Sequence, residues 1–156
     1  MKKVIIILIL LILILIYYFY KPEWRNSGNL IGKRIPYSSK ILESYDTHGG
    51  FHGDGEYYVV FQLTNEQYKK FLKDVFVDSN WEKMPLSNDI QKISYWFSKG
   101  EHARQYELPL DTPNGLYYFR DFQHSKKPIW DRNSVNFVIS ILDIRNERLF
   151  ICRVDS

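Results

Sequence analysis

The amino-acid sequence predicts an α+β protein, in which an N-terminal transmembrane helix is followed by one domain with a mainly antiparallel sheet and one or two packed helices. Three observations predict this class. An uncharged run opens the chain, the segment 64–76 has helical periodicity, and the remainder holds short aromatic and β-branched runs between turn residues. The order β-β-α-(α)-β-β-β then favours helices on one side of the sheet.

The first element is the uncharged run Val4–Tyr20, which follows two lysines. An apolar segment of about 17–25 residues can cross a bilayer, and this run lies at the short end of that range. A cleaved signal peptide is the alternative, but no A-x-A-like site follows the run. The sequence therefore predicts an uncleaved signal-anchor over 1–20, with the lipid bilayer as its partner, and a single-pass cell-membrane protein whose C-terminal domain is extracytoplasmic. The positions assigned to the anchor are Val4, Ile16, Tyr17, Tyr20 and Trp24.

The rest of the chain divides into two parts. Residues 21–40 hold prolines, glycines and scattered charge, which predicts a linker or irregular lead-in, and 41–156 form a single α+β domain. The net charge of the chain is +3, and without the two N-terminal lysines it is +1, which gives no electrostatic case for binding nucleic acid. The single Cys152 excludes an internal disulfide. It alternates with Phe150 and Val154, which predicts a buried packing residue.

Two strands and a helix are expected in the first half of the domain. Aromatic and β-branched residues predict strands over Ile41–Tyr45 and Tyr57–Leu63. Thr64 and Gln67 then have the spacing of a capping box. Apolar residues follow at i, i+3, i+4, i+7 and i+8, so this is the clearest helix of the chain.

The second half predicts one more helix and three strands. Ser87 is placed to cap a short helix that carries Ile90 and Ile93, although a strand from Ile93 is the alternative. Residues 98–114 lack periodicity and are expected to be mostly loop. The strands are expected over Leu116–Arg120, Ser134–Leu142 and Arg148–Val154, the last two forming a β-hairpin.

The stretch Asp46–Glu56 departs furthest from ordinary globular composition. Its eleven residues hold four of the eight glycines, two of the four histidines and three carboxylates. Set between two expected strands, the glycines predict a tight turn or a backbone nest that binds an anion. These glycines are Gly49, Gly50, Gly53 and Gly55. Their spacing fits neither a P-loop nor a dinucleotide fingerprint.

The polar side chains of the same stretch predict a second use, as a divalent-metal site. His and Asp side chains suit zinc, iron or manganese, and on an extended backbone alternating positions project to one face. The candidate ligands or metal-binding residues are Asp46, His48, His52 and Asp54, with Asp121 and His124 as more distant candidates. No serine lies in a G-x-S-x-G elbow, so nucleophilic catalysis has little support.

The chain resembles small uncharacterised membrane-anchored proteins of Gram-positive bacteria. The residues that carry the resemblance are Thr47–Gly55, Trp81, Met84–Leu86, Tyr117–Asp121 and Asn136–Phe137. The glycine and histidine string is the specific part. The resemblance implies a membrane-anchored bacterial protein, and it transfers no catalytic residue because no activity is known for such proteins.

These observations predict a non-enzymatic module that binds a ligand or partner, either a cell-surface protein or a cell-wall ligand. The alternative is a metal-dependent, hydrolase-like enzyme that uses His48, His52, Asp46 and Asp54.

Overall fold

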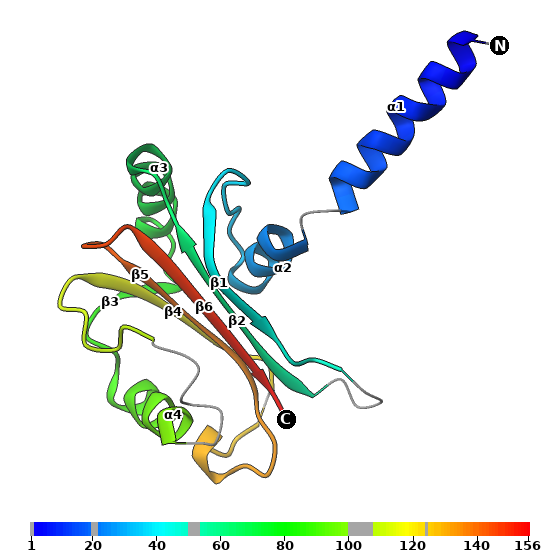
Figure 1. Ribbon diagram of the computed structural model, residues 1–156. Helices are drawn as coiled ribbons and strands as arrows, with labels where there is room; N and C mark the ends of the chain where they lie inside the picture. The colour runs from blue at the N-terminus through cyan, green and yellow to red at the C-terminus, as the bar shows by residue number, and fades with distance from the viewer. Residues whose placement is uncertain (1, 20–21, 50–53, 100–107, 124) are drawn as a thin grey trace. The chain divides into compact units, whose positions relative to one another are not determined.

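The computed structural model describes residues 2–19, 22–49, 54–99, 108–123 and 125–156 (Figure 1). The chain forms two compact units, Met1–Tyr37 and Ser38–Ser156. The first unit is helical, and the second is built on one six-stranded sheet. The predicted α+β class with a mainly antiparallel sheet is therefore confirmed.

The first unit begins with helix α1, Lys2–Phe19, in which the side chains of Ile5–Ile16 are all exposed. The helix includes Lys2 and Lys3, so its uncharged part is 4–19, which is shorter than the ~17 apolar residues that a membrane span needs. Among the residues that the structure describes, no helix is long and apolar enough to cross a membrane. The predicted transmembrane anchor over 1–20 is therefore wrong, and so are the single-pass topology and the membrane localisation drawn from it.

Helix α2, Pro22–Ile31, lies in the range 21–40 that was expected to be a linker or irregular lead-in. Proline at the first helical position and an acid in the first turn, Glu23, both favour a helix start. The glycine content of the range concealed this signal. Of the positions assigned to the anchor, Val4, Ile16 and Tyr17 lie in α1 and Trp24 lies in α2, whereas Tyr20 lies outside the described residues.

The second unit is an antiparallel sheet with the strand order β1-β2-β6-β5-β4-β3. The strands are β1 Lys40–Asp46, β2 Gly55–Gln62, β3 Trp81–Lys83, β4 Gly115–Asp121, β5 Asn136–Asp143 and β6 Arg148–Asp155. Five of them correspond to the expected strands. Strand β3 was not expected, because three residues with one apolar side chain show no periodicity. The last strand of the chain, β6, lies between β2 and β5 near the middle of the sheet.

Helices α3, Asn65–Phe76, and α4, Asn88–Lys99, cover opposite faces of the sheet. Ile90 of α4 belongs to the core cluster on one face. On the other face, Phe71 of α3 packs edge-on against Trp81, with ring centroids 6.0 Å apart. The expectation of helices on one side is therefore wrong. The central strands are apolar on both faces, so each face needs a cover.

The helix starts follow the capping residues of the sequence. The Thr64 hydroxyl accepts from the backbone N–H of Gln67 at 3.4 Å, and Gln67 Oε1 accepts from the backbone N–H of Thr64 at 2.9 Å. This confirms the predicted capping box. Ser87 Oγ accepts from the backbone N–H of Ile90 at 3.4 Å, so the helical alternative is correct for this segment. The loop expected over 98–114 lies partly outside the described residues, which omit 100–107.

Cys152 is fully buried on β6, as its alternation with apolar residues predicted. Burial raises the pKa of its thiol well above the ordinary value, and the charge of Glu56 adds to the shift. The thiol is therefore neutral and shielded, which is the opposite of what a reactive cysteine needs.

This shift predicts a loss of stability in alkali. A group whose pKa is raised on folding contributes stability fully below the pKa of the unfolded chain, about 8.5 for a thiol, and that stability is lost as the pH rises towards the folded value. We expect the free energy of unfolding to fall above about pH 8.5 by up to ~1.4 kcal/mol per pH unit, relative to Cys152→Ala. Urea denaturation of both proteins between about pH 7.5 and 10 measures the difference. An identical pH dependence of the two proteins would contradict a neutral, buried thiol.

Candidate functional site

The unusual stretch of the sequence lies at one end of the sheet. Here β1 and β6 end, β2 and β5 begin, and β4 ends. We call this the polar end of the sheet, defined by the strand termini Asp46, Gly55, Asp155, Asn136 and Asp121 and the residues beside them. Figure 1 shows the C-terminus and the 3-10 helix η2, Ile129–Asp131, at this end, away from the turn that joins β5 and β6.

His48 is held by Asp46 through two contacts. Asp46 Oδ1 accepts a hydrogen bond from the backbone N–H of His48 at 2.9 Å and lies 2.8 Å from the ring Nδ1. Because a carboxylate only accepts, Nδ1 carries the proton, and Nε2 is the acceptor of the neutral ring. Nε2 is buried and has no partner among the described residues. Asp46 therefore orients the ring in the way that a carboxylate positions a ligating histidine.

The chain beside this pair passes very close to Gly55. The backbone N–H of Thr47 donates to Glu56 O at 2.9 Å, and Thr47 Oγ1 accepts from the backbone N–H of Glu56 at 2.8 Å. A Cβ on Gly55 would lie 2.6 Å from the backbone N of His48, so this position requires glycine for space. At Gly49 the nearest atom would be 3.7 Å away. Gly50 and Gly53 lie outside the described residues, and the anion nest stays a prediction.

The divalent-metal site also stays a prediction. His52 and His124 lie outside the described residues, and within the described ranges no three His, Cys, Asp or Glu side chains gather closely enough to hold a metal ion. Asp54 is exposed. Asp121 on β4 is four strand spacings from β1, which is roughly 19 Å at ~4.8 Å each. Because ligand atoms lie about 2 Å from zinc, Asp121 does not share an ion with His48.

Two arginines flank an aromatic ring at the polar end of the sheet. The guanidinium carbons of Arg120 and Arg153 lie 4.9 and 5.8 Å from the ring centroid of Phe122. Arg153 Nη2 donates to Asp155 Oδ2 at 2.7 Å, but its Nε is buried and has no partner among the described residues. Asn136 lies opposite Asp155 in the ladder, and its Oδ1 is likewise buried and unpartnered in the described part of the chain.

The arginines and the Asp46–His48 pair share one face of the sheet. The ladder places Asp46, Tyr57, Arg153, Val138 and Arg120 in one row across five strands. Directly opposite residues of an antiparallel ladder point to the same side. The pair and the arginines therefore face the same surface, although the chain separates them by more than sixty residues.

The opposite face holds a salt bridge. Arg132 Nη1 lies 2.7 Å from Asp121 Oδ2, an ion-pair distance without the angle of a hydrogen bond. The backbone N–H of Gln123 donates to Asp121 Oδ1 at 2.9 Å. Asp121, a predicted ligand, thus holds the connection between β4 and β5. On this face Glu56 Oε2 is buried and has no partner among the residues described.

Buried polar atoms without hydrogen-bond partners concentrate at the polar end of the sheet. Six such side-chain atoms occur among the described residues, and five of them lie here, the sixth being Trp81 Nε1. The five are His48 Nε2, Glu56 Oε2, Arg132 Nη1, Asn136 Oδ1 and Arg153 Nε. Each unsatisfied buried group costs about 1–3 kcal/mol. Such a cluster needs an explanation, and a bound ligand is one that accounts for several atoms together.

Sequence reasoning found one side of this surface and missed the other. It selected Asp46 and His48 from local composition. It missed Arg153, Asn136 and Arg120, because only the strand register brings them together. One feature of the sequence could have indicated Arg153. It is a charged residue at an inward position near the end of an otherwise apolar strand.

Comparisons of the chain with protein-family models, with curated proteins and with solved structures find no match. They leave the resemblance to small membrane-anchored proteins untested. The function therefore has to be argued from the side chains of the polar end of the sheet.

The close approach at Gly55 predicts a contrast between two glycines of one connection. We expect Gly55→Ala to lower the free energy of unfolding by about 1–3 kcal/mol, because the new methyl group meets the His48 backbone. Gly49→Ala is the matched control, and we expect a change within about 0.5 kcal/mol, since its methyl group has room. Urea denaturation measures both. Equal effects of the two substitutions would contradict the packing of His48 over Gly55.

Proposed function

We propose that the protein is a non-enzymatic ligand-binding module that holds a small anion at the polar end of the sheet. The observation that carries this proposal is the group of unpartnered buried polar atoms beside two arginines, above all Arg153 Nε and Asn136 Oδ1. Both atoms are covered by neighbouring side chains, so a ligand on this face displaces those side chains and supplies the partner that the described residues do not.

The charged groups of the site suit binding. A guanidinium group keeps its charge at every physiological pH, so Arg120 and Arg153 attract and orient an anion but exchange no proton with it. Arg120 is exposed and forms no ion pair with a carboxylate among the described residues. The ring of Phe122 restricts both side chains through cation–π contacts, so less freedom is lost when a ligand binds.

The neutral amide of Asn136 restricts the class of ligand further. Asn136 Oδ1 is an acceptor, so it matches a hydroxyl or amino group and not a second anionic oxygen. The site therefore fits a small carboxylate or phosphate ester that carries a hydroxyl or amino group close to its charge. His48 Nε2 lies on the same face, but β1 is four strand spacings from the strand of Arg120, so His48 does not share a small ligand with Arg120.

The proposal predicts that glycerol phosphate raises the melting temperature of the full chain. At 100-fold excess over the dissociation constant, one bound ligand adds about 2.7 kcal/mol of stability. Scanning calorimetry with increasing glycerol phosphate measures the rise. We expect Arg120→Gln to remove most of it, because the substitution deletes the exposed charge and leaves the core untouched.

Arg145→Gln is the matched control, because it removes the same charge from the turn at the other end of the sheet. We expect this variant to respond to glycerol phosphate as the wild type does. The proposal fails if glycerol phosphate leaves the melting temperature of the wild type unchanged. It also fails if the two variants respond alike, since the effect is then one of general ionic strength.

A further inference from the structure

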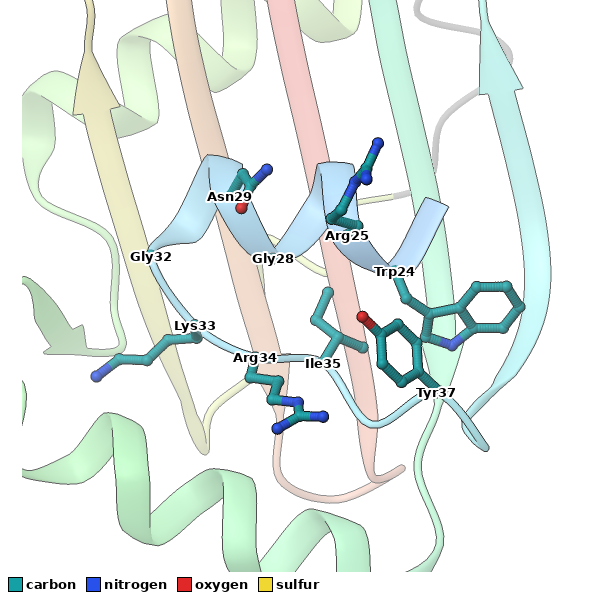
Figure 2. A pocket seen from close by; sticks show the side chains of 9 residues that line it. All are labelled: Trp24, Arg25, Gly28, Asn29, Gly32, Lys33, Arg34, Ile35 and Tyr37. Atoms are coloured by element: carbon teal, nitrogen blue, oxygen red, sulfur yellow. The ribbon is translucent and has the colours of Figure 1, made fainter. Parts of the chain in front are cut away.

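The first unit contains a cavity of about 450 Å³ between helix α2 and the chain that follows it. This volume lies within the range of small-molecule pockets, roughly 300–1,000 Å³. The residues that line it are Trp24, Arg25, Gly28, Asn29, Gly32, Lys33, Arg34, Ile35 and Tyr37. Figure 2 shows them on the helix and on the returning chain, with the cavity between the two. We call it the helix-reversal pocket.

Two glycines create this pocket. Gly32 follows the last residue of α2 in the left-handed region, at φ 63°, and the backbone N–H of Lys33 donates to Gly28 O at 3.0 Å. This is the hydrogen bond of a Schellman C-cap, which reverses the chain direction. A Cβ on Gly28 would lie 2.6 Å from Lys33 O, so glycine at that position lets the returning chain pass close to the helix.

The lining of the pocket has one sign of charge. Three of its side chains are cationic, Arg25, Lys33 and Arg34, and none is acidic. Arg25 and Arg34 are exposed and form no ion pair with a carboxylate among the described residues. In Figure 2 their charged ends point away from each other, that of Arg25 beyond the helix and that of Arg34 beyond the returning chain. Positive groups around one cavity raise the local concentration of anions.

One end of the pocket is aromatic. Figure 2 shows Trp24 and Tyr37 at the same end, beside Ile35. The guanidinium carbon of Arg34 lies 5.7 Å from the ring centroid of Tyr37. Aromatic faces and a guanidinium plane are the surfaces on which proteins stack planar rings. The pocket thus combines a place for a ring with a place for a negative charge.

We propose that the helix-reversal pocket binds a phosphorylated molecule with a planar ring, of the mononucleotide class. A phosphate monoester carries a charge of about −1.5 to −2 at neutral pH, which three cations match better than they match the single charge of a carboxylate. The ring stacks at the Trp24 and Tyr37 end, and the side chains of Arg25, Lys33 and Arg34, whose charged ends diverge in Figure 2, turn inward to contact the phosphate. This site is separate from the polar end of the sheet and does not depend on the function proposed for it.

Calorimetric titration of the full chain with adenosine monophosphate tests the proposal. We expect saturable binding of one equivalent, and at least tenfold weaker binding of adenosine alone and of inorganic phosphate alone. Arg25→Gln and Arg34→Gln should each weaken the binding of adenosine monophosphate about tenfold, because each removes a charged hydrogen-bond donor to the phosphate. Lys69→Gln, on the exposed face of α3, is the charge-matched control and should leave the affinity unchanged.

The results of these titrations test the phosphate contact and the ring contact separately. No binding of adenosine monophosphate at millimolar concentration overturns it, and so does equal affinity of the Arg25, Arg34 and Lys69 variants. Inorganic phosphate that binds as tightly as adenosine monophosphate overturns the planar-ring assignment. Arg120→Gln should keep the full affinity for adenosine monophosphate. Failure at this pocket and failure at the polar end of the sheet are therefore distinguishable.

Discussion

Burial of β5 and β6 on both faces is the constraint on which the second unit depends. Seven of the eight residues of β5 and five of the eight residues of β6 are buried. Each face must therefore be covered, and α4 lies on one face and α3 on the other. A polar side chain is tolerated in the middle of the sheet only when it has a hydrogen-bond partner. Ser140 shows this, because its hydroxyl donates to Phe150 O at 2.8 Å. Charged and unpaired polar side chains are therefore excluded from the centre of the sheet and lie where the strands end.

At the polar end of the sheet, this exclusion leaves charged groups that are neither fully solvated nor fully paired. Arg153 gives Nη2 to Asp155 and keeps a buried Nε without a partner among the described residues. Burying a charged donor without an acceptor is unfavourable, and a bound anion removes that penalty. The helix-reversal pocket has a different origin, since a backbone turn at Gly28 and Gly32 creates it. Both sites present guanidinium groups beside aromatic rings.

The sequence predicts local structure well, but it predicts poorly which residues distant in the chain come together in the fold. The capping box at Thr64 and the hairpin of β5 and β6 depend on neighbouring residues, so pattern alone predicts them. Half of the candidate site, the Asp46–His48 pair, was visible for the same reason. Arg120 and Arg153 face one surface only because β6 pairs with β2 and β5, which no local pattern reveals. The predicted membrane anchor was wrong because the uncharged run, already at the short end of the spanning range, contributes only residues 4–19 to helix α1.

Side-chain NMR of the arginine Nε–H groups tests the central claim most directly. The full chain, labelled with nitrogen-15, is titrated with glycerol phosphate, and Arg120→Lys and Arg153→Lys identify the two signals. We expect the Nε–H signals of Arg120 and Arg153 to shift together and to saturate, while that of Arg145 stays in place. A stationary Arg153 signal, or equal shifts of all arginine signals, would contradict an anion site at the polar end of the sheet.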